Sequence, residues 1–177
     1  TTEIYTLSLH DALPIYSSSV LPGPSPLYGW PGLPRRPFRW SGGPIEFPCP
    51  MVRLGLIDLP YLGGTYLRLL PAAVRRIGLR RAAQDEALWA YCHPWEFDTE
   101  EAFHQHDHIG TLASRIAWLG RSRMGRQLGR LLRGSVAPPL GEVADDLAGD
   151  DLPVVDPNRP PELGSVARWA NGRLRQR

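Results

Sequence analysis

The sequence contains no lysine, and all twenty of its basic residues are arginine. This bias is typical of GC-rich coding DNA, so it does not by itself indicate phosphate recognition. The formal net charge of +2 likewise argues neither for nor against nucleic acid as a partner. Cys49 and Cys92 are the only cysteines, which is too few for a disulfide framework or for a metal site made of cysteine alone.

Long apolar runs are also missing, and no charged-then-apolar leader opens the chain. We therefore expect no membrane span. The opening segment, residues 1–15, reads residue for residue as the translation of a common sequencing adapter. We expect these residues to be an artefact and the natural sequence to begin near Tyr16, with the upstream part of the gene missing.

The 177 residues give room for one domain of ordinary size, and 42% of them are hydrophobic, which is enough for a core. The 19 prolines and 18 glycines crowd before residue 65 and after residue 133. Residues 16–50 are rich in aromatics as well, which predicts an ordered but irregular loop. The proline-rich and acidic residues 134–177 predict a disordered tail.

The middle of the chain alternates between strand and helix patterns, which favours an α/β fold. Residues 45–48 and 51–59 predict strands, and residues 71–81 predict a helix that begins at Pro71. Residues 109–133 carry a long helical pattern, broken by Gly120 and Gly125.

The stretch Ala-Leu-Trp-Ala-Tyr-Cys-His-Pro-Trp-Glu-Phe-Asp, residues 87–98, is apolar on both faces until it reaches His93. This pattern predicts a buried strand covered on both sides. Pro94 disfavours helical geometry at His93, so we expect His93 to lie extended at the end of the strand. In α/β folds, this end is where ligands and catalytic groups gather.

Two segments together resemble the C-terminal part of bacterial polysaccharide deacetylases, the NodB-homology proteins with an extra C-terminal domain of unassigned function. They are Leu-Gly-Gly-Thr-Tyr-Leu-Arg-Leu-Leu-Pro, residues 62–71, and Ala-Tyr-Cys-His-Pro-Trp-Glu-Phe-Asp, residues 90–98. Residues 16–22 match a third pattern, except that Ser17 stands where that family usually has Asp. The resemblance covers residues 16–133, and further matching positions between the segments are Tyr28, Gly29, Glu46, Phe47, Pro48 and Arg53.

The resemblance implies a fragment of a distorted β/α barrel of the NodB type. It also implies hydrolysis of N-acetyl groups on amino sugars of an envelope or exopolysaccharide. In that family, an Asp and two His hold a divalent, zinc-like metal that activates water. Those motifs lie upstream of this segment, so we expect no metal here and no activity from the chain alone. Location stays open between the bacterial cytoplasm and the cell envelope, and so does the oligomeric state.

His93 is our first candidate for catalysis, because it resembles the late histidine motif of the deacetylases and is placed for acid catalysis. The alternative is a structural histidine bonded to neighbouring backbone. Glu96 is expected to orient His93 or hold a sugar hydroxyl, and Trp95 to stack on a sugar ring. The alternatives are a solvated carboxylate for Glu96 and a packed indole for Trp95. Arg68, which lies in one of the two motifs, is expected to meet a carboxylate, from a protein partner or from an acidic sugar.

His104, His106 and His108 form a second cluster, and His104 and His108 would share a helix face at a spacing that can bind zinc. A usable site needs a third ligand, so we favour a solvent-exposed run. Four arginines on the last helical segment could contact nucleic acid or an acidic polysaccharide. A solvated face is preferred because no aromatics are interleaved, and no nucleic-acid partner is expected. These arginines are Arg123, Arg126, Arg130 and Arg133.

The sequence therefore predicts the C-terminal fragment of a metal-dependent polysaccharide deacetylase, with a polysaccharide as partner. One alternative is a non-catalytic carbohydrate-binding or assembly module, which the aromatic residues 28–40 support. A second alternative is a zinc-binding protein that uses His104 and His108.

Overall fold

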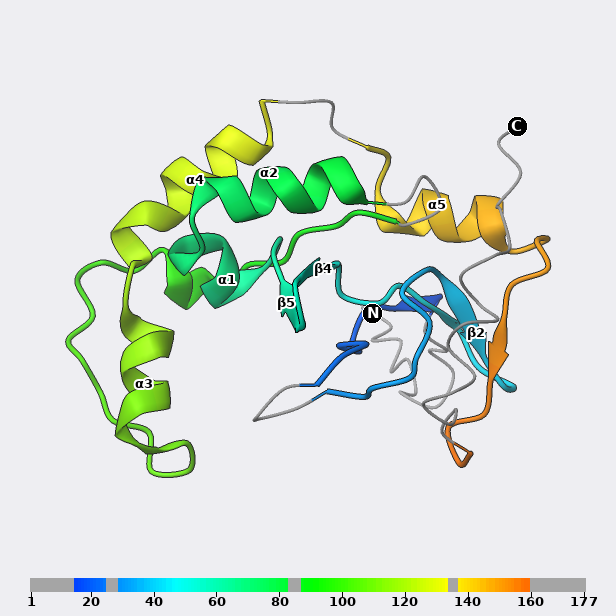
Figure 1. Cartoon of the computed structure of the whole chain (residues 1–177), viewed down its shortest axis with the longest axis horizontal. Helices are drawn as coiled ribbons and strands as arrows, with labels where there is room; N and C mark the ends of the chain where they lie inside the picture. The colour runs from blue at the N-terminus through cyan, green and yellow to red at the C-terminus, as the bar shows by residue number, and fades with distance from the viewer. Residues whose placement is uncertain (1–14, 25–28, 83–86, 134–136, 160–177) are drawn as a thin grey trace, which may run out of the picture.

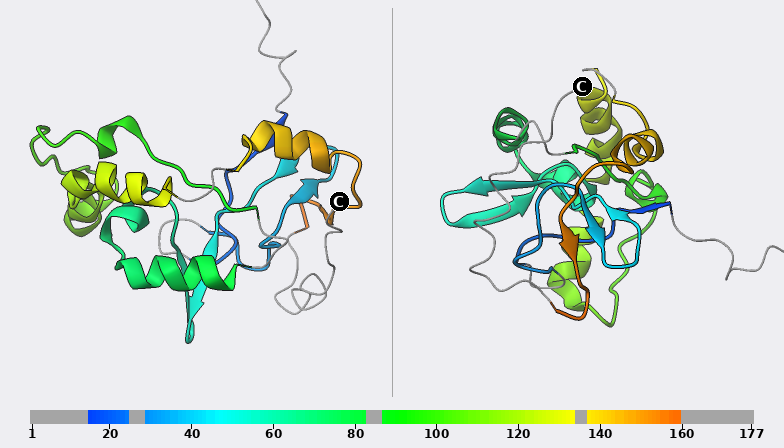
Figure 2. Two further views of the ribbon diagram at one scale, coloured as in Figure 1. Left: turned by 90° about the horizontal axis from the view of Figure 1, so that it is seen from above. Right: turned by 90° about the vertical axis from the view of Figure 1, so that its right-hand side faces the viewer.

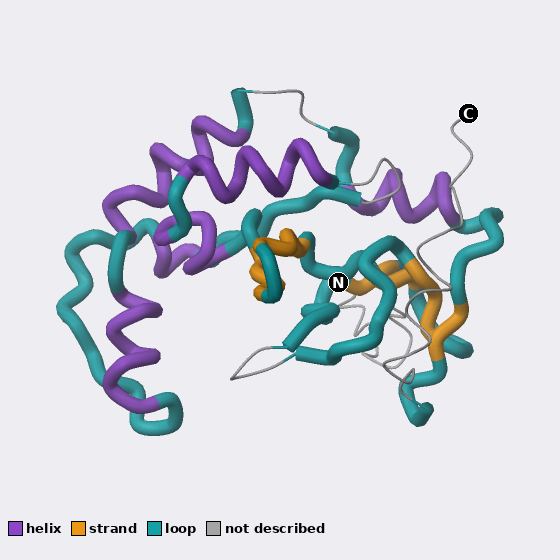
Figure 3. The backbone as a smooth tube through the Cα atoms, viewed as in Figure 1, coloured by secondary structure: helices purple, strands orange, loops and turns teal. Residues whose placement is uncertain are grey.

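The computed structural model describes residues 15–24, 29–82, 87–133 and 137–159. Most of the adapter-like opening, and residues 160–177 of the expected tail, lie outside these ranges. Figure 1 shows a small sheet with helix α5 on one side of the molecule and the helices α1 to α4 on the other. The same division is visible from above in Figure 2. Loops connect most elements, as the tube in Figure 3 shows.

The sheet has four short strands, β1 (Tyr16–Ser17), β2 (Phe38–Trp40), β3 (Ile45–Glu46) and β6 (Val154–Val155). Their order in the sheet is β1-β3-β2-β6. Strand β3 pairs in parallel with β1 and antiparallel with β2, whereas β2 and β6 are parallel. The fold is therefore mixed α/β. Within the described residues the sheet is open, and they form no barrel of the expected NodB type.

Helix α5 (Leu140–Leu147) covers the sheet, because Ala144 packs against the buried Ile45 and Phe47. Strand β6 then adds Val155 to a second cluster with Phe38. The predicted disorder of residues 134–177 is therefore wrong for residues 137–159. Glu142, Asp145 and Asp146 lie on the exposed side of α5, and the composition alone hid the apolar side of this helix.

Residues 51–60 form a hairpin rather than one strand. Strand β4 (Met51–Leu54) pairs antiparallel with β5 (Ile57–Pro60), and Gly55 at the turn has a φ of 63°, which glycine adopts without strain. The hairpin packs on α2 (Ala72–Arg81) through an apolar cluster that includes Val52. The helix predicted at residues 71–81 is confirmed, with Pro71 immediately before its first residue.

The remaining helices are α1 (Gly64–Leu69), α3 (Gly110–Trp118) and α4 (Met124–Leu131), with a 3-10 turn η2 (Arg121–Arg123) before α4. The expected break at Gly120 is confirmed, and its φ of 76° ends the run of α3. Gly125 lies inside α4 and breaks nothing. None of the helices in the described part of the chain has the length and apolar character that a bilayer crossing requires.

The predicted buried strand at residues 87–98 is wrong. Residues 87–93 are extended but pair with no strand among the described residues, and they lie on the surface as a connection between the two sides of the molecule. Trp89 and Tyr91 face inward, whereas Leu88, Ala90 and Cys92 are exposed. The pattern suggested cover on both faces, but only the face with the two large aromatic rings is covered.

Candidate functional site

His93 has the extended backbone that the following proline predicts, with a φ of −107° and a ψ of 150°. It precedes the 3-10 turn η1 (Pro94–Glu96). Within this turn the Glu96 carboxylate folds back. Its Oε2 accepts a hydrogen bond from the backbone N–H of His93 at 2.9 Å and lies 3.3 Å from Nδ1 of the His93 ring. The expected orienting contact between Glu96 and His93 is therefore present.

Arg68 reaches the other oxygen of the same carboxylate. Its Nε lies 3.2 Å from Glu96 Oε1, and both side chains are fully buried. The contact is ionic without meeting hydrogen-bond geometry. Burial lowers the pKa of Arg68, and the negative charge of Glu96 opposes that shift. The carboxylate that we expected Arg68 to meet is thus one from the protein itself.

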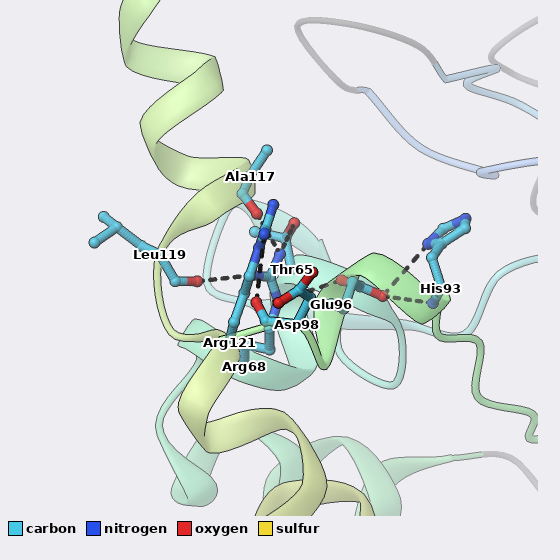
Figure 4. Close-up of polar contacts among 8 residues, drawn as sticks. All are labelled: Thr65, Arg68, His93, Glu96, Asp98, Ala117, Leu119 and Arg121. Atoms are coloured by element: carbon cyan, nitrogen blue, oxygen red, sulfur yellow. Dashed lines mark hydrogen bonds and ion pairs between the residues drawn. The ribbon is translucent and has the colours of Figure 1, made fainter. Parts of the chain in front are cut away.

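The other guanidinium nitrogens of Arg68 hold the end of helix α3. They donate to the backbone carbonyls of Leu119 at 2.8 Å and Ala117 at 2.9 Å, and to the hydroxyl of Thr65 at 2.9 Å. A cation at these carbonyls is favourable because they carry the negative end of the helix. Figure 4 shows the resulting chain of contacts, from α3 through Arg68 and Glu96 to His93.

The Gly63-Gly64 pair explains how the two motifs can approach so closely. The Gly64 backbone N–H donates to the carbonyl of Tyr91 at 2.9 Å. A Cβ at Gly63 would lie 2.0 Å from the Tyr91 ring, and one at Gly64 would lie 3.3 Å from a Glu96 oxygen. Gly64 also has a φ of 49°. Glycine is therefore required here for contact, and at Gly64 for its backbone conformation as well.

Trp95 is 39% exposed and already has several partners. The His93 ring stacks on it with centroids 5.5 Å apart, and the guanidinium carbons of Arg68 and Arg121 lie 5.5 and 5.3 Å from its ring centroid. These are cation–π distances. A sugar could reach only the exposed part of this indole. The rest of the ring is packed, as the alternative to sugar stacking predicted.

A pocket of about 330 Å³ lies beside His93. Its lining includes the half-exposed His93, the rings of Trp89 and Tyr91, and the serines Ser18 and Ser19. Arg68 and Glu96 do not line it. Both side chains are fully buried, so in this structure they support His93 at the rim from behind. The substrate contacts considered for them stay a prediction.

The second histidine cluster does not converge. His104, His106 and His108 lie in exposed loop residues before α3, so the helical spacing considered for zinc is not formed. In the described ranges, no group of three or more His, Cys, Asp or Glu side chains is placed to hold a metal ion. The arginines of α4 are exposed, as a solvated face would be.

A family model described as a domain of unknown function, DUF3473, matches residues 18–137. The chain belongs to this family. Comparison with curated proteins and with solved structures gave no match. The DUF3473 match includes both motifs, residues 62–71 and 90–98, and also Ala117 and Leu119. Every residue in the contacts that link α3 through Arg68 and Glu96 to His93 therefore lies within the match.

The DUF3473 match also includes a residue that the sequence did not single out as functional. Glu46 is buried, and its Oε1 accepts the backbone N–H groups of Ser19 at 2.8 Å and Val20 at 3.1 Å. Its Oε2 accepts from the indole of Trp40 at 3.1 Å. Glu46 therefore fixes one wall of the pocket. In the sequence, the position of this carboxylate between the apolar Ile45 and Phe47 could have indicated that Glu46 is buried.

Proposed function

We propose that this DUF3473 chain is the C-terminal part of a polysaccharide deacetylase, and that the pocket beside His93 takes an N-acetylated amino sugar. The observation that carries the proposal is the contact of a half-exposed histidine, at a pocket rim, with a fully buried carboxylate. The resemblance of the two motifs to deacetylases supports the reaction class.

In this proposal His93 supplies the proton that the leaving amine needs when the amide bond breaks. Glu96 lies against Nδ1, which leaves Nε2 as the nitrogen free to face a substrate. Arg68 holds Glu96 from behind and is itself held by the end of α3. Glu96 and Arg68 therefore act as one support that fixes the direction of the His93 imidazole ring.

The resemblance also implies a divalent metal, but the described residues do not offer a set of ligands that fits one. A metal in the parent protein would have to be held by other residues. The roles proposed for His93, Glu96 and Arg68 therefore concern ring orientation and proton transfer alone.

A carbohydrate-binding module is the second candidate, and a separate observation favours it. Trp89 and Tyr91 form a tilted aromatic pair with centroids 5.6 Å apart, and both rings line the pocket. Aromatic faces of this kind suit the apolar faces of sugar rings. Under this hypothesis the same sugar would bind, and no acetate would be released.

The deciding experiment joins the upstream coding sequence, recovered from the source DNA, to residues 16–177. Acetate release from N-acetylglucosamine oligomers is then measured for this protein and for its His93→Ala and His104→Ala variants. The deacetylase proposal expects His93→Ala to lose about 100-fold or more in rate, a typical loss for a missing general acid. The exposed His104 serves as the matched control, and its variant should keep full activity.

Two results would overturn the enzyme proposal. One is an upstream sequence without metal-binding Asp and His motifs, and the other is a His93→Ala variant as active as the parent. Saturable binding of the oligomers without acetate release would favour the binding module instead.

A further inference from the structure

A second pocket, of about 400 Å³, lies between the β4–β5 hairpin and the end of α2. Its size is in the range of small-molecule sites. Three arginines from three separate segments line it: Arg35 from the loop before β2, Arg53 from β4 and Arg81 from the last turn of α2. Gly55 and Gly78 also line it.

Among the described residues, the positive charge of this pocket is only partly balanced. Asp58 on β5 pairs with Arg35 at 2.7 Å and with Arg53 at 2.6 Å, and within the described part of the chain it is the only carboxylate paired with any of the three. The hydrogen bond from Arg53 holds the pKa of Asp58 down to about 2, with a further contribution from Arg35 and against the effect of burial. Asp58 is therefore ionised near neutral pH, and in the part of the chain that the structure describes one paired carboxylate faces three guanidinium groups.

The guanidinium groups are also held in place. Arg53 makes two parallel bonds to Asp58, Nε to Oδ1 at 3.0 Å and NH2 to Oδ2 at 2.6 Å. Arg81 donates from NH1 to the backbone carbonyl of Arg53 at 3.0 Å. A guanidinium has five N–H donors, so each arginine keeps donors beyond these bonds. Because these N–H donors are already held in place, less conformational entropy is lost when they bind an anion.

We propose that this pocket binds an oxyanion group: the phosphate, sulfate or carboxylate of a ligand. Planar guanidinium donors match the paired oxygens of all three groups. A purely structural role explains the cluster less well, because an ion pair with an exposed partner such as Arg53 adds little stability, and Arg81 makes no ion pair with Asp58. This inference does not depend on the proposed deacetylase function.

The test titrates the whole 177-residue chain with inorganic phosphate, sulfate, glucuronate and, as a neutral control, glucose. Binding is followed by the arginine Nε–H signals in NMR spectra. We expect saturable binding of the anions, with a Kd below about 10 mM, and none of glucose. Tighter binding of glucuronate than of phosphate would identify a sugar acid as the source of the group, and the reverse order would identify a phosphate ester.

Arg81→Gln is the informative variant, because Arg81 does not hold Asp58 and its loss should leave the hairpin intact. Its neighbour Arg80, on the same helix but outside the pocket lining, provides the matched control Arg80→Gln. We expect Arg81→Gln to weaken phosphate binding about tenfold, the value of one charged hydrogen bond, and Arg80→Gln to change it less than about twofold.

Arg35→Gln gives a second measurement should Arg81→Gln unfold, which a thermal melt would show. Absence of saturable anion binding would overturn the proposal. An equal loss from Arg80→Gln would overturn it as well, because the binding would then reflect only diffuse positive charge.

Discussion

Replacing Arg68 by methionine should destabilise the protein more than any exposed arginine substitution. The change removes the ion pair with Glu96 and the donors to Leu119, Ala117 and Thr65. It leaves the Glu96 carboxylate fully buried without a positive partner. Breaking one side of a buried ion pair costs about 3–5 kcal/mol, and two backbone carbonyls lose a donor in addition. We expect a loss of about 4 kcal/mol in the free energy of unfolding.

The measurement is urea unfolding followed by tryptophan fluorescence, for which the chain offers six indoles. Glu96→Gln and the double variant complete a mutant cycle. Because the double variant leaves no unpaired charge, its loss should be smaller than the sum of the single losses by about 2 kcal/mol. The cycle therefore measures the coupling of Arg68 to Glu96.

Arg121→Met is the matched control, since Arg121 also lies over the Trp95 ring but pairs with Glu101, which is half exposed. Arg121 itself is mostly buried, with 10% of its side chain exposed, but the Glu101 carboxylate stays half in water. The control should therefore lose less stability than Arg68→Met, whose partner carboxylate is fully buried. The reasoning fails if Arg68→Met costs less than about 1 kcal/mol, or if Arg121→Met costs as much as Arg68→Met.

Three further results should follow. Asp58 has a folded-state pKa of about 2, below its usual 3.8, so its stabilising effect is complete above pH 4 and is lost as the pH falls towards 2. After allowance for solvent screening this effect is about 1–2 kcal/mol, and acid titration of Asp58→Asn should lack that part of the pH dependence. Gly63→Ala should fail to fold or lose about 3 kcal/mol in urea unfolding, because the new Cβ would meet the Tyr91 ring; a near-native stability would refute the packing. Cys92 should react quickly with a thiol reagent at pH 8 while Cys49, whose pKa is raised to about 12 by burial, stays protected until unfolding; equal rates would contradict this burial.

The sequence predicted best where a local rule is strong. Pro94 fixed the extended backbone of His93, Pro71 marked the start of α2, and Gly120 marked the end of α3. Each of these effects depends on one residue and its immediate neighbours. The contact between Glu96 and His93 was also predictable, because it spans a single turn.

The sequence failed where tertiary contacts decide. Residues 87–93 have the composition of a buried strand, yet no described strand pairs with them. Strand pairing depends on a neighbouring segment, and the composition of residues 87–93 does not specify one. Residues 137–159 suggested disorder because their acidic residues were counted as composition, without regard to the helical spacing of the apolar residues between them. The pairing of Arg68 with Glu96 joins residues from two motifs that are distant in the sequence. It depends on the close contact of Gly64 with Tyr91, which is a tertiary contact as well.

The Arg68–Glu96 pair is poorly explained as a source of stability. Taking two charges out of water costs several kcal/mol per ion, and well-packed apolar residues in place of such pairs often give an equally stable protein. What an apolar pair cannot do is present a carboxylate oxygen to the His93 backbone and ring while holding the end of α3. The geometry of the pair therefore fits a positioning role. A double variant that combines Arg68→Leu with Glu96→Leu leaves no unpaired buried charge, so it should lose less stability than Arg68→Met alone, while the orientation of the His93 ring, seen in its NMR couplings, is lost.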